Sequence, residues 1–378
     1  MSLRTTIRRL RAEAMSLSHH ALQLLVLTVG TSLAFLGTRT LANAERAARV
    51  RDADAWYAIG QRALADGHPA VAADAYRRAL VRVRDDKRYG IGLARASFLD
   101  HDTDAAWNAL ASLREATPED ADLNVELARL AAARDDVPTA TRLYHNALYA
   151  PWPADSGATR RQVRIELITF LLAHDRASSA QAELLALTAD LPDTAADHLQ
   201  VAALFAAAGD HPHALEHYQR SVRLAPDNAD ALAGVGREAF QLGQYALARD
   251  MLRRAPSDAP DVQALRDVTE QLLSSDPLAP RLGAAERRRR LLDDLRYVQD
   301  RWTTCAARVP VNADETSIAH DLDMLITHPS ALSVSQDAVE SAIDLIDRAL
   351  RGAVARCGPQ TPRDRALQLI ARHANGGA

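Results

Sequence analysis

Apolar side chains recur at every third or fourth position along most of this chain, which is the spacing of one face of an α-helix. The stretch ADAWYAIGQRALADGHPAVAADAYRRAL, residues 53–80, contains two such periods separated by ADGHP. Gly and Pro in that separator end one helix and allow a second to begin. Long runs of Val and Ile, which favour strands, do not occur in the sequence. The pattern predicts an all-α protein in which residues 53–80 form a helical hairpin.

This hairpin recurs with a period of 34 residues. With Ala53 as position 1, a small residue returns at position 20 and, in five of the six units, at position 8, and a bulky residue returns at position 24. The units begin at residues 53, 87, 121, 161, 195 and 229, with six additional residues around PWPADSGATR before the fourth unit. One helix pair cannot bury its apolar face alone, so the units must stack. Residues 53–262 are therefore predicted to form a solenoid.

The repeated pattern resembles the tetratricopeptide repeat (TPR) family. Small residues at positions 8 and 20 would let the two helices of a hairpin approach closely, and the residue at position 24 would fill the gap to the next hairpin. Turns such as DG, GD and LGQY offer a glycine for a positive φ, and Pro at position 32 ends the second helix. Two departures are that Trp stands at position 4 only once and Gly at position 8 only twice. The resemblance implies about six helical repeats with a concave, partner-binding surface.

The sequence after the solenoid also has helical periodicity. Residues 263–280 are predicted to be a capping helix and a linker, with apolar positions spaced for a helix over residues 261–277. Residues 281–378 are predicted to form a small C-terminal helical domain. Its expected helices cover residues 284–308, 315–328, 335–358 and 362–374.

The N-terminus combines a basic segment with an apolar one. Residues 1–20 contain four arginines, and the 17 residues from Ala21 to Gly37 carry no charge. This length is near the lower limit for a helix that crosses a bilayer core, and the preceding arginines favour a cytoplasmic N-terminus with the body outside. We expect an uncleaved transmembrane anchor, with a signal peptide cut after Ala44 as the alternative. In both cases residues 45–378 are exported.

Charge and motifs narrow the possible functions. Residues 1–44 have a formal charge of +4, which leaves −8 for the remainder of the chain. An acidic body is a poor match for nucleic acid, because phosphate binding needs clustered positive charge. The sequence has no HExxH, GxSxG, P-loop or dinucleotide-binding pattern. We therefore expect no catalytic residues, no cofactor and no bound metal.

The two cysteines, Cys305 and Cys357, are each placed near a predicted helix end. An even pair in an exported chain favours a disulfide. Closing this loop would contribute on the order of 4 kcal/mol in the chain-entropy model. The alternative is a pair of buried, reduced thiols.

Two clusters of charged or titratable side chains have simple structural explanations. Arg287 to Arg290 form a run of four arginines whose acidic neighbours can pair with them on a solvated helix face, with anionic lipid head groups as the minor alternative. His213 and His217 share a helix face at a spacing that could seat a metal. Both belong to the second, outer helix of their repeat, so an exposed, unliganded pair is the expected arrangement.

The most informative positions are those on the first helix of each repeat, which line the concave surface in the family that this chain resembles. They hold aromatic residues and arginines, namely Tyr57, Arg95, Phe98, Arg129, Arg237 and Phe240. Such a groove suits an extended or helical protein segment with acidic and apolar residues. The alternative is that Phe98 and Phe240, at position 12 of their repeats, pack against the next helix and that the arginines pair with nearby carboxylates.

These observations predict a TPR scaffold or adaptor in a bacterial inner membrane, with a single span and its body in the periplasm. It would hold protein partners during envelope assembly, secretion or export. One alternative is a polysaccharide-binding module, for which the chain offers only 17 aromatic residues. The other is an enzyme with its site in residues 280–378, where no catalytic motif stands.

Overall fold

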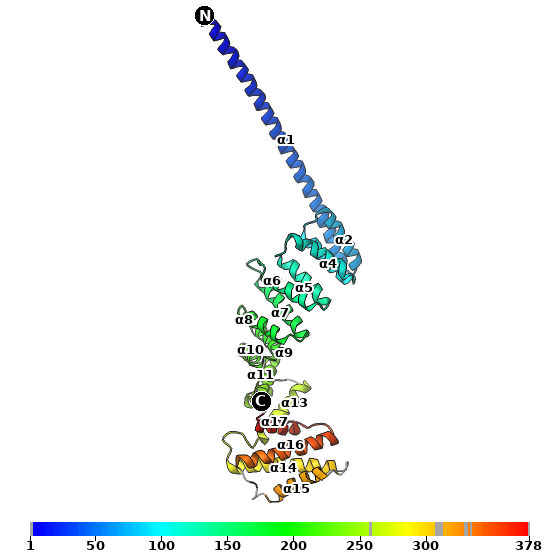
Figure 1. Cartoon of the computed structure of the whole chain (residues 1–378), viewed down its shortest axis with the longest axis vertical. Helices are drawn as coiled ribbons and strands as arrows, with labels where there is room; N and C mark the ends of the chain where they lie inside the picture. Colours follow the sequence, from blue (N-terminus) through cyan, green and yellow to red (C-terminus); the bar gives the residue numbers. More distant parts are fainter. Residues whose placement is uncertain (1–2, 257–258, 307–312, 329–331, 333–334, 377–378) are drawn as a thin grey trace. The chain divides into compact units, whose positions relative to one another are not determined.

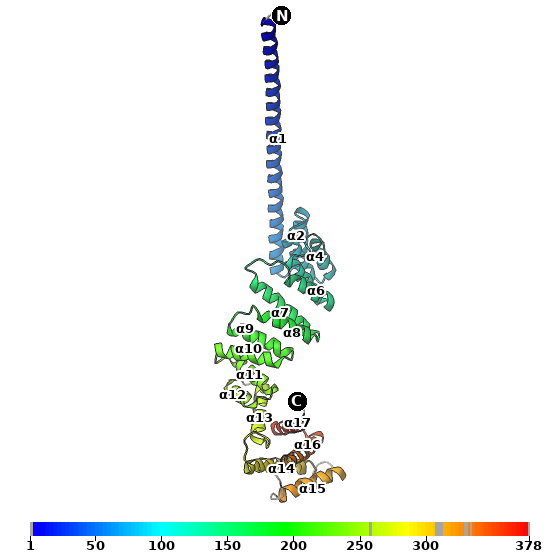
Figure 2. The same cartoon turned by 60° about the vertical axis from the view of Figure 1, so that its left-hand side comes forward.

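The computed structural model describes residues 3–256, 259–306, 313–328, 332 and 335–376, and this part of the chain is helical, without strands (Figures 1 and 2). It divides into two compact units, Met1–Leu167 and Ile168–Ala378. The prediction of an all-α fold is confirmed.

The first unit begins with one long helix that ends as the first helix of a hairpin (Figure 1). Five shorter helices follow it, and a sixth begins before the unit ends. The bounds are α1 Leu3–Ala65, α2 Pro69–Arg82, α3 Lys87–Leu99, α4 Thr103–Ala116, α5 Ala121–Ala133, α6 Val137–Leu148 and α7 Gly157–Ala173.

The second unit continues the hairpins and adds the C-terminal helices. Its hairpin helices and the helix after them are α8 Ala177–Thr188, α9 Ala195–Ala207, α10 His211–Leu224, α11 Ala229–Gln241, α12 Tyr245–Arg254 and α13 Pro260–Ser275. The remaining helices are α14 Ala284–Ala306, α15 Ala313–Thr327, α16 Gln336–Cys357 and α17 Pro362–Ala374.

The helices follow the register predicted from the sequence. Helices α3, α5, α9 and α11 each begin at position 1 of their unit. Helix α7 begins at Gly157, four residues before the position 1 expected at Arg161, because the insertion before it supplies extra helical residues. The repeated hairpins are thus confirmed as the unit of the fold.

Tyr76 shows how small and bulky positions cooperate between neighbouring hairpins. A Cβ on Gly60 would lie 2.6 Å from the Tyr76 ring, and a Cβ on Gly92 would lie 2.8 Å from it. The ring is therefore held between a glycine of its own hairpin and a glycine of the next. Tyr76 is 2% exposed, so this stacking is close-packed core.

The turn inside each hairpin passes through a residue with positive φ. The residues, all at position 15, are Gly67, His101, Asp135, Asp175, Gly209 and Gly243. Glycine adopts this conformation without steric cost, whereas a side chain makes it unfavourable. The expected positive φ is confirmed for the glycine turns, and three repeats take the same shape without glycine.

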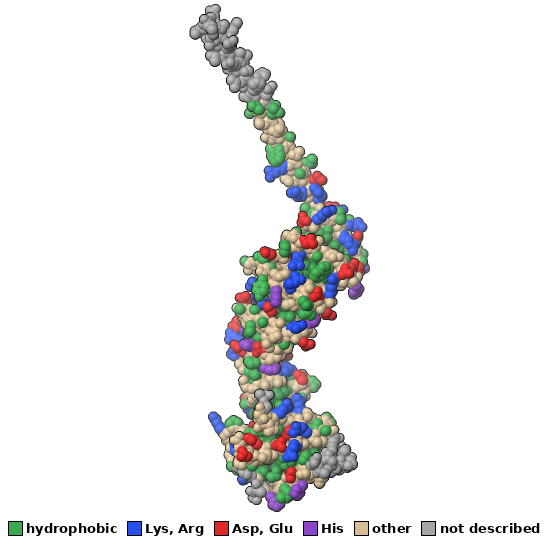
Figure 3. Space-filling model, viewed as in Figure 1, with side chains coloured by type: hydrophobic (Ala, Val, Ile, Leu, Met, Phe, Trp, Pro, Cys, Tyr) green, Lys and Arg blue, Asp and Glu red, His purple; other side chains and the backbone are tan. Residues whose placement is uncertain are grey.

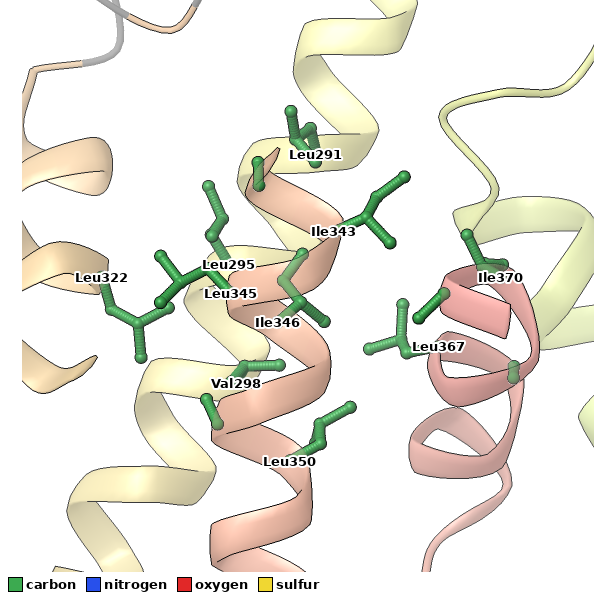
Figure 4. Packing of buried hydrophobic residues seen from close by; sticks show 14 of the residues in the cluster. Leu291, Leu295, Val298, Leu322, Ile343, Leu345, Ile346, Leu350, Leu367 and Ile370 are labelled. Carbon is green, nitrogen blue, oxygen red and sulfur yellow. The ribbon is translucent and has the colours of Figure 1, made fainter. Parts of the chain in front are cut away.

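The C-terminal helices share one hydrophobic core (Figure 4). Leu295 and Val298 of α14 are fully buried in it, together with Leu350 of α16. Helix α13, predicted to cover the last repeat, contributes Val268 and Leu272 to the same core. Residues from α13 to α17 thus pack as one body.

Ion pairs are sealed inside this C-terminal region. Arg301 Nη2 lies 2.8 Å from Asp364 Oδ2, and the Asp364 side chain has no exposed surface. Tyr297 donates its hydroxyl to the other oxygen of the same carboxylate at 2.8 Å. A second pair joins Arg363 to Asp294, whose carboxylate is 2% exposed. Burial raises the pKa of Asp294 to about 6, against the opposing effect of Arg363.

Cys305 is one of the two cysteines of the predicted disulfide. It is 5% exposed on α14, and its Sγ is 4.0 Å from the carbonyl oxygen of Ala353 on α16. Ala353 precedes Cys357 by four residues, about one helical turn. The side chain of Cys357 lies outside the described residues, so the bond stays a prediction.

Candidate partner-binding site

The arginines predicted to line the groove are joined to glutamates across three helices. Arg95 of α3 donates from Nη2 to Glu126 of α5 at 2.5 Å. Arg129 of α5 donates to the same Glu126 oxygen at 2.9 Å. It also donates two hydrogen bonds, of 2.8 and 2.9 Å, to the carboxylate of Glu166 on α7. We call Arg95, Glu126, Arg129 and Glu166 the arginine–glutamate ladder. It brings Arg95 and Arg129, which are 34 residues apart on neighbouring repeats, to the same glutamate.

The ladder balances its own charge, since it contains two arginines and two glutamates. The bond to Glu126 raises the pKa of Arg95, and the bonds to Glu166 raise the pKa of Arg129. These partners reduce the need for an acidic ligand. The two arginines differ, however, because Arg129 is held by two carboxylates, whereas Arg95 makes one bond among the described residues and keeps a side chain that is 57% exposed.

A small hollow lies beside the ladder. It has a volume of about 140 Å³ and is lined by Ala94, Arg95, Phe98, Leu110, Glu126, Arg129 and Leu130. Phe98 is 38% exposed, which is high for an aromatic side chain. The hollow therefore combines an accessible apolar ring with the accessible guanidinium of Arg95.

Tyr57 occupies a more interior place than the groove prediction gave it. Its ring contacts Tyr76 and Tyr89 at centroid distances of 5.5 and 5.4 Å, and it packs against both clusters of buried side chains in the first repeats. Tilted aromatic contacts of this kind stabilise packing. Tyr57 supports the surface on which Arg95 stands.

The predicted residues of the sixth repeat belong to the second unit and make internal contacts there. Arg237 of α11 pairs with Asp261 of α13 at 2.8 Å. Phe240 packs edge-on against Tyr245 at 5.3 Å and adjoins the C-terminal core. These contacts match the alternative expectation, because Arg237 pairs with a carboxylate and Phe240 packs against the next helix.

A larger hollow, which the groove prediction did not include, adjoins the insertion between the third and fourth repeats. Its volume is about 720 Å³, and its wall includes Lys87, Pro118, Glu119, Asp120, Asp122, Pro151, Trp152 and Pro153. Trp152 donates its ring N–H to the carbonyl of Ala147 at 2.8 Å, which fixes the ring. Lys87 bonds Asp120 and Asp122 at 3.0 and 2.7 Å. The sequence signal for this hollow was the PWP segment, residues 151–153, at the end of the third repeat and next to the six additional residues.

Helix α1 contains the one candidate membrane span found in the described part of the chain. Within Leu24–Ala65 an 18-residue stretch has a mean hydropathy of 1.5 and no buried residues. Figure 3 shows hydrophobic side chains on the surface of this helix. Leu33 and Phe35 in this stretch are 64% and 65% exposed. Threonine hydroxyls in this stretch donate to carbonyls one turn back, as Thr31 does to Leu27 at 2.8 Å.

The arginine run of α14 faces the protein at three of its four positions. Arg287 and Arg290 donate to the carbonyls of Pro277 and Leu273, and Arg288 to that of Leu332. Arg289 pairs with Glu286 and Asp293. The expectation was a solvated helix face, whereas three of these arginines bond backbone carbonyls of the protein.

Among the described residues, no group of three or more His, Cys, Asp or Glu is placed to hold a metal ion.

The comparisons with known proteins agree with this architecture. Residues 205–272 match the family model described as tetratricopeptide repeat, and they span the end of α9 through most of α13. Together with the hairpins in 34-residue register, this match shows that the chain contains tetratricopeptide repeats. No curated protein matches the chain.

Several solved structures are similar. PilF of Pseudomonas aeruginosa shares 16% identity over 57% of this chain and 97% of its own, with a TM-score of 0.41. PilW, a widely conserved type IV pilus biogenesis factor, shares 15% identity over 56% and 97%, with a TM-score of 0.40. The C-terminal part of a repeat protein from Cytophaga hutchinsonii shares 12% identity over 76% and 98%, with a TM-score of 0.43.

Proposed function

We propose that this protein is a membrane-anchored TPR scaffold that holds a protein partner on the first helices of its N-terminal repeats. The observation that carries this proposal is the exposed pair of Phe98 and Arg95 beside the 140 Å³ hollow. An apolar group and a cation that is still accessible at one spot are what a protein segment with an apolar and an acidic side chain requires.

The ladder changes the roles proposed for the two arginines. Arg95 has guanidinium donors left to meet a carboxylate of the partner. Arg129 already bonds the carboxylates of Glu126 and Glu166, and we assign it to orienting Glu126, which in turn holds Arg95. Arg95 and Phe98 are thus the contact residues in this proposal, and Arg129 is a positioning residue.

The anchor is the second part of the proposal. Helix α1 runs without a break through the apolar segment, through residues 42–44 where a signal peptidase would cut, and into the first repeat. In the apolar stretch, threonine hydroxyls bonded to the backbone leave little polar surface for lipid to meet. Four arginines before the span favour the orientation with the repeats in the bacterial periplasm.

Membrane topology can be tested by proteolysis. Protease added to spheroplasts is expected to digest residues 45–378 while α1 stays with the membrane fraction. Protection of the repeats would overturn the orientation. Release of a soluble chain that begins at Glu45 would establish a cleaved signal peptide instead of an anchor.

Partner binding can be tested with three matched variants of the full chain. Arg95→Ala is expected to weaken retention of the co-purifying partner about tenfold, since a shielded charge-assisted bond contributes roughly 1.5–3 kcal/mol. Phe98→Ala should weaken it by a similar factor. Arg77→Ala, on the exposed face of α2, should retain the partner and serves as the control.

The 720 Å³ hollow lined by Trp152 is the alternative binding site for the same partner. If Trp152→Ala releases the partner while Arg95→Ala and Phe98→Ala retain it, the partner binds at the insertion. If all of these variants retain it, the repeats of the first unit do not carry the binding surface.

A further inference from the structure

Two histidines of the fifth repeat meet ring nitrogen to ring nitrogen. His198 stands on α9 and His217 on α10, and their Nδ1 atoms are 2.9 Å apart. The ring centroids are 5.1 Å apart with the planes inclined by 30°, so the two nitrogens lie between the rings. The His198 side chain is 14% exposed. This is the geometry of an N–H···N hydrogen bond, in which one nitrogen must carry the proton and the other a lone pair.

The neighbours of the pair decide which nitrogen carries the proton. His198 Nε2 lies 3.0 Å from Asp193 Oδ1, and Arg220, which also bonds Asp193, helps lower the pKa of that carboxyl to about 2. An ionised carboxylate only accepts, so His198 must donate from Nε2. A neutral His198 then has a bare Nδ1, and His217 donates its Nδ1–H to it.

We infer that His198 and His217 share a proton across the α9–α10 contact, and that this bridge makes the fifth hairpin loosen in acid. One additional proton can be held without loss of the bridge. His198 then carries both of its protons beside Asp193 and donates to His217, whose remaining proton moves to Nε2. A second additional proton puts a hydrogen on both facing nitrogens, and the bridge cannot form.

The surroundings oppose that second proton. The pKa of His217 is lowered, first by burial and then by the charge of His198, with His213 acting in the same direction and Glu216 against them. Phe205 stacks on the His217 ring at 5.5 Å with the planes inclined by 17°. On α11, Glu238 is occupied by His211 at 2.7 Å. His217 is therefore held neutral over a pH range in which a free histidine is charged.

The consequence for stability has a definite sign. The unfolded chain takes up protons on these histidines as pH falls through about 6.5, whereas the folded chain resists the second proton. The unfolded state then binds more protons, so stability falls as pH decreases below that value. The stabilising contribution of the histidine pair is fully present above about pH 6.5.

The tautomers can be read directly from the full-length protein in detergent micelles with 15N-labelled histidine. At pH 7.5, NMR should show His198 protonated at Nε2 and His217 at Nδ1, assigned by the signals lost in His198→Asn and His217→Phe. On acidification His217 should take up its second ring proton only below the pH at which a free histidine is charged. Opposite tautomers, or a His217 that is protonated as readily as a free histidine, would overturn the inference.

Denaturant unfolding supplies the matched control. Between pH 7 and pH 5 the unfolding equilibrium constant of the native chain should rise about tenfold more than that of His217→Phe. His320→Gln, which changes an exposed histidine on α15 away from the pair, should keep the pH dependence of the native chain. Equal pH dependence of the native chain and His217→Phe would also contradict the shared proton.

Discussion

In the repeats of the first unit, ion pairs join neighbouring helices at the surface, whereas in the C-terminal region two ion pairs between helices have buried carboxylates. Arg95 is 57% exposed in its pair with Glu126, and Lys87 is 46% exposed in its pair with Asp122. Asp364 and Asp294 of the C-terminal region are 0% and 2% exposed in theirs. The surface pairs can exchange partners at little cost, but the buried ones cannot.

This difference separates two tasks. Arg95 keeps an exposed side chain while the ladder joins neighbouring repeats. The buried pairs of α14 and α17 are committed to one packing, because a single missing partner leaves a charge without solvent or counter-ion. The comparison therefore favours the repeats as the partner-binding surface and the C-terminal region as a structural body.

The largest effect is expected from Asp364→Ala. This change removes the partner of Arg301, the acceptor of Tyr297, and one half of the capping box with Thr361 at the start of α17. Breaking a buried ion pair costs about 3–5 kcal/mol. Denaturant titration should show this loss, and far-UV circular dichroism should show that the repeats stay folded.

The control for that variant is Asp344→Ala. Asp344 pairs with Arg348 on the surface of α16, with 47% of its side chain exposed, and its removal should cost no more than about 0.5 kcal/mol. Equal losses in the two variants would show that burial does not decide how much an ion pair contributes to stability.

An intermediate effect is expected from Gly92→Ala in the repeats. The new methyl group would lie 2.8 Å from the ring of Tyr76, and overpacking of this kind costs about 1–3 kcal/mol. Gly157→Ala, where the added methyl group meets only Arg161 at 3.7 Å, should be neutral or stabilising. Thermal unfolding of both variants checks the prediction, and a stabilised Gly92→Ala would contradict the close stacking.

A smaller gain in stability is expected from Asp135→Gly. Asp135 has a φ of 56° in the turn between α5 and α6, a conformation that glycine adopts without the side-chain penalty. The gain should be about 1 kcal/mol. Gly209→Ala, at the equivalent position with a φ of 75°, should lose a similar amount. The midpoint of unfolding should rise in Asp135→Gly and fall in Gly209→Ala.

The sequence alone predicted the helices and their register, because small, bulky and turn residues at fixed spacing are local signals. It also placed Arg95 and Arg129 side by side. It could not show that Glu126 and Glu166 occupy those arginines, since carboxylates are frequent on every helix and only the packing selects which ones meet. The hollow at Trp152 and the contact between His198 and His217 likewise depend on residues from different helices.

The most direct test of the partner site is site-specific photo-crosslinking in membranes. A benzoyl-phenylalanine in place of Phe98 should give a covalent adduct with the partner, because Phe98 is 38% exposed beside the ladder. The same group in place of Val71, which is 57% exposed on α2, should give none. An adduct from position 98 but not from position 71 is the result that our proposal predicts. Adducts from both positions alike, or none from position 98 while one in place of Trp152 or in the C-terminal helices reacts, would contradict it.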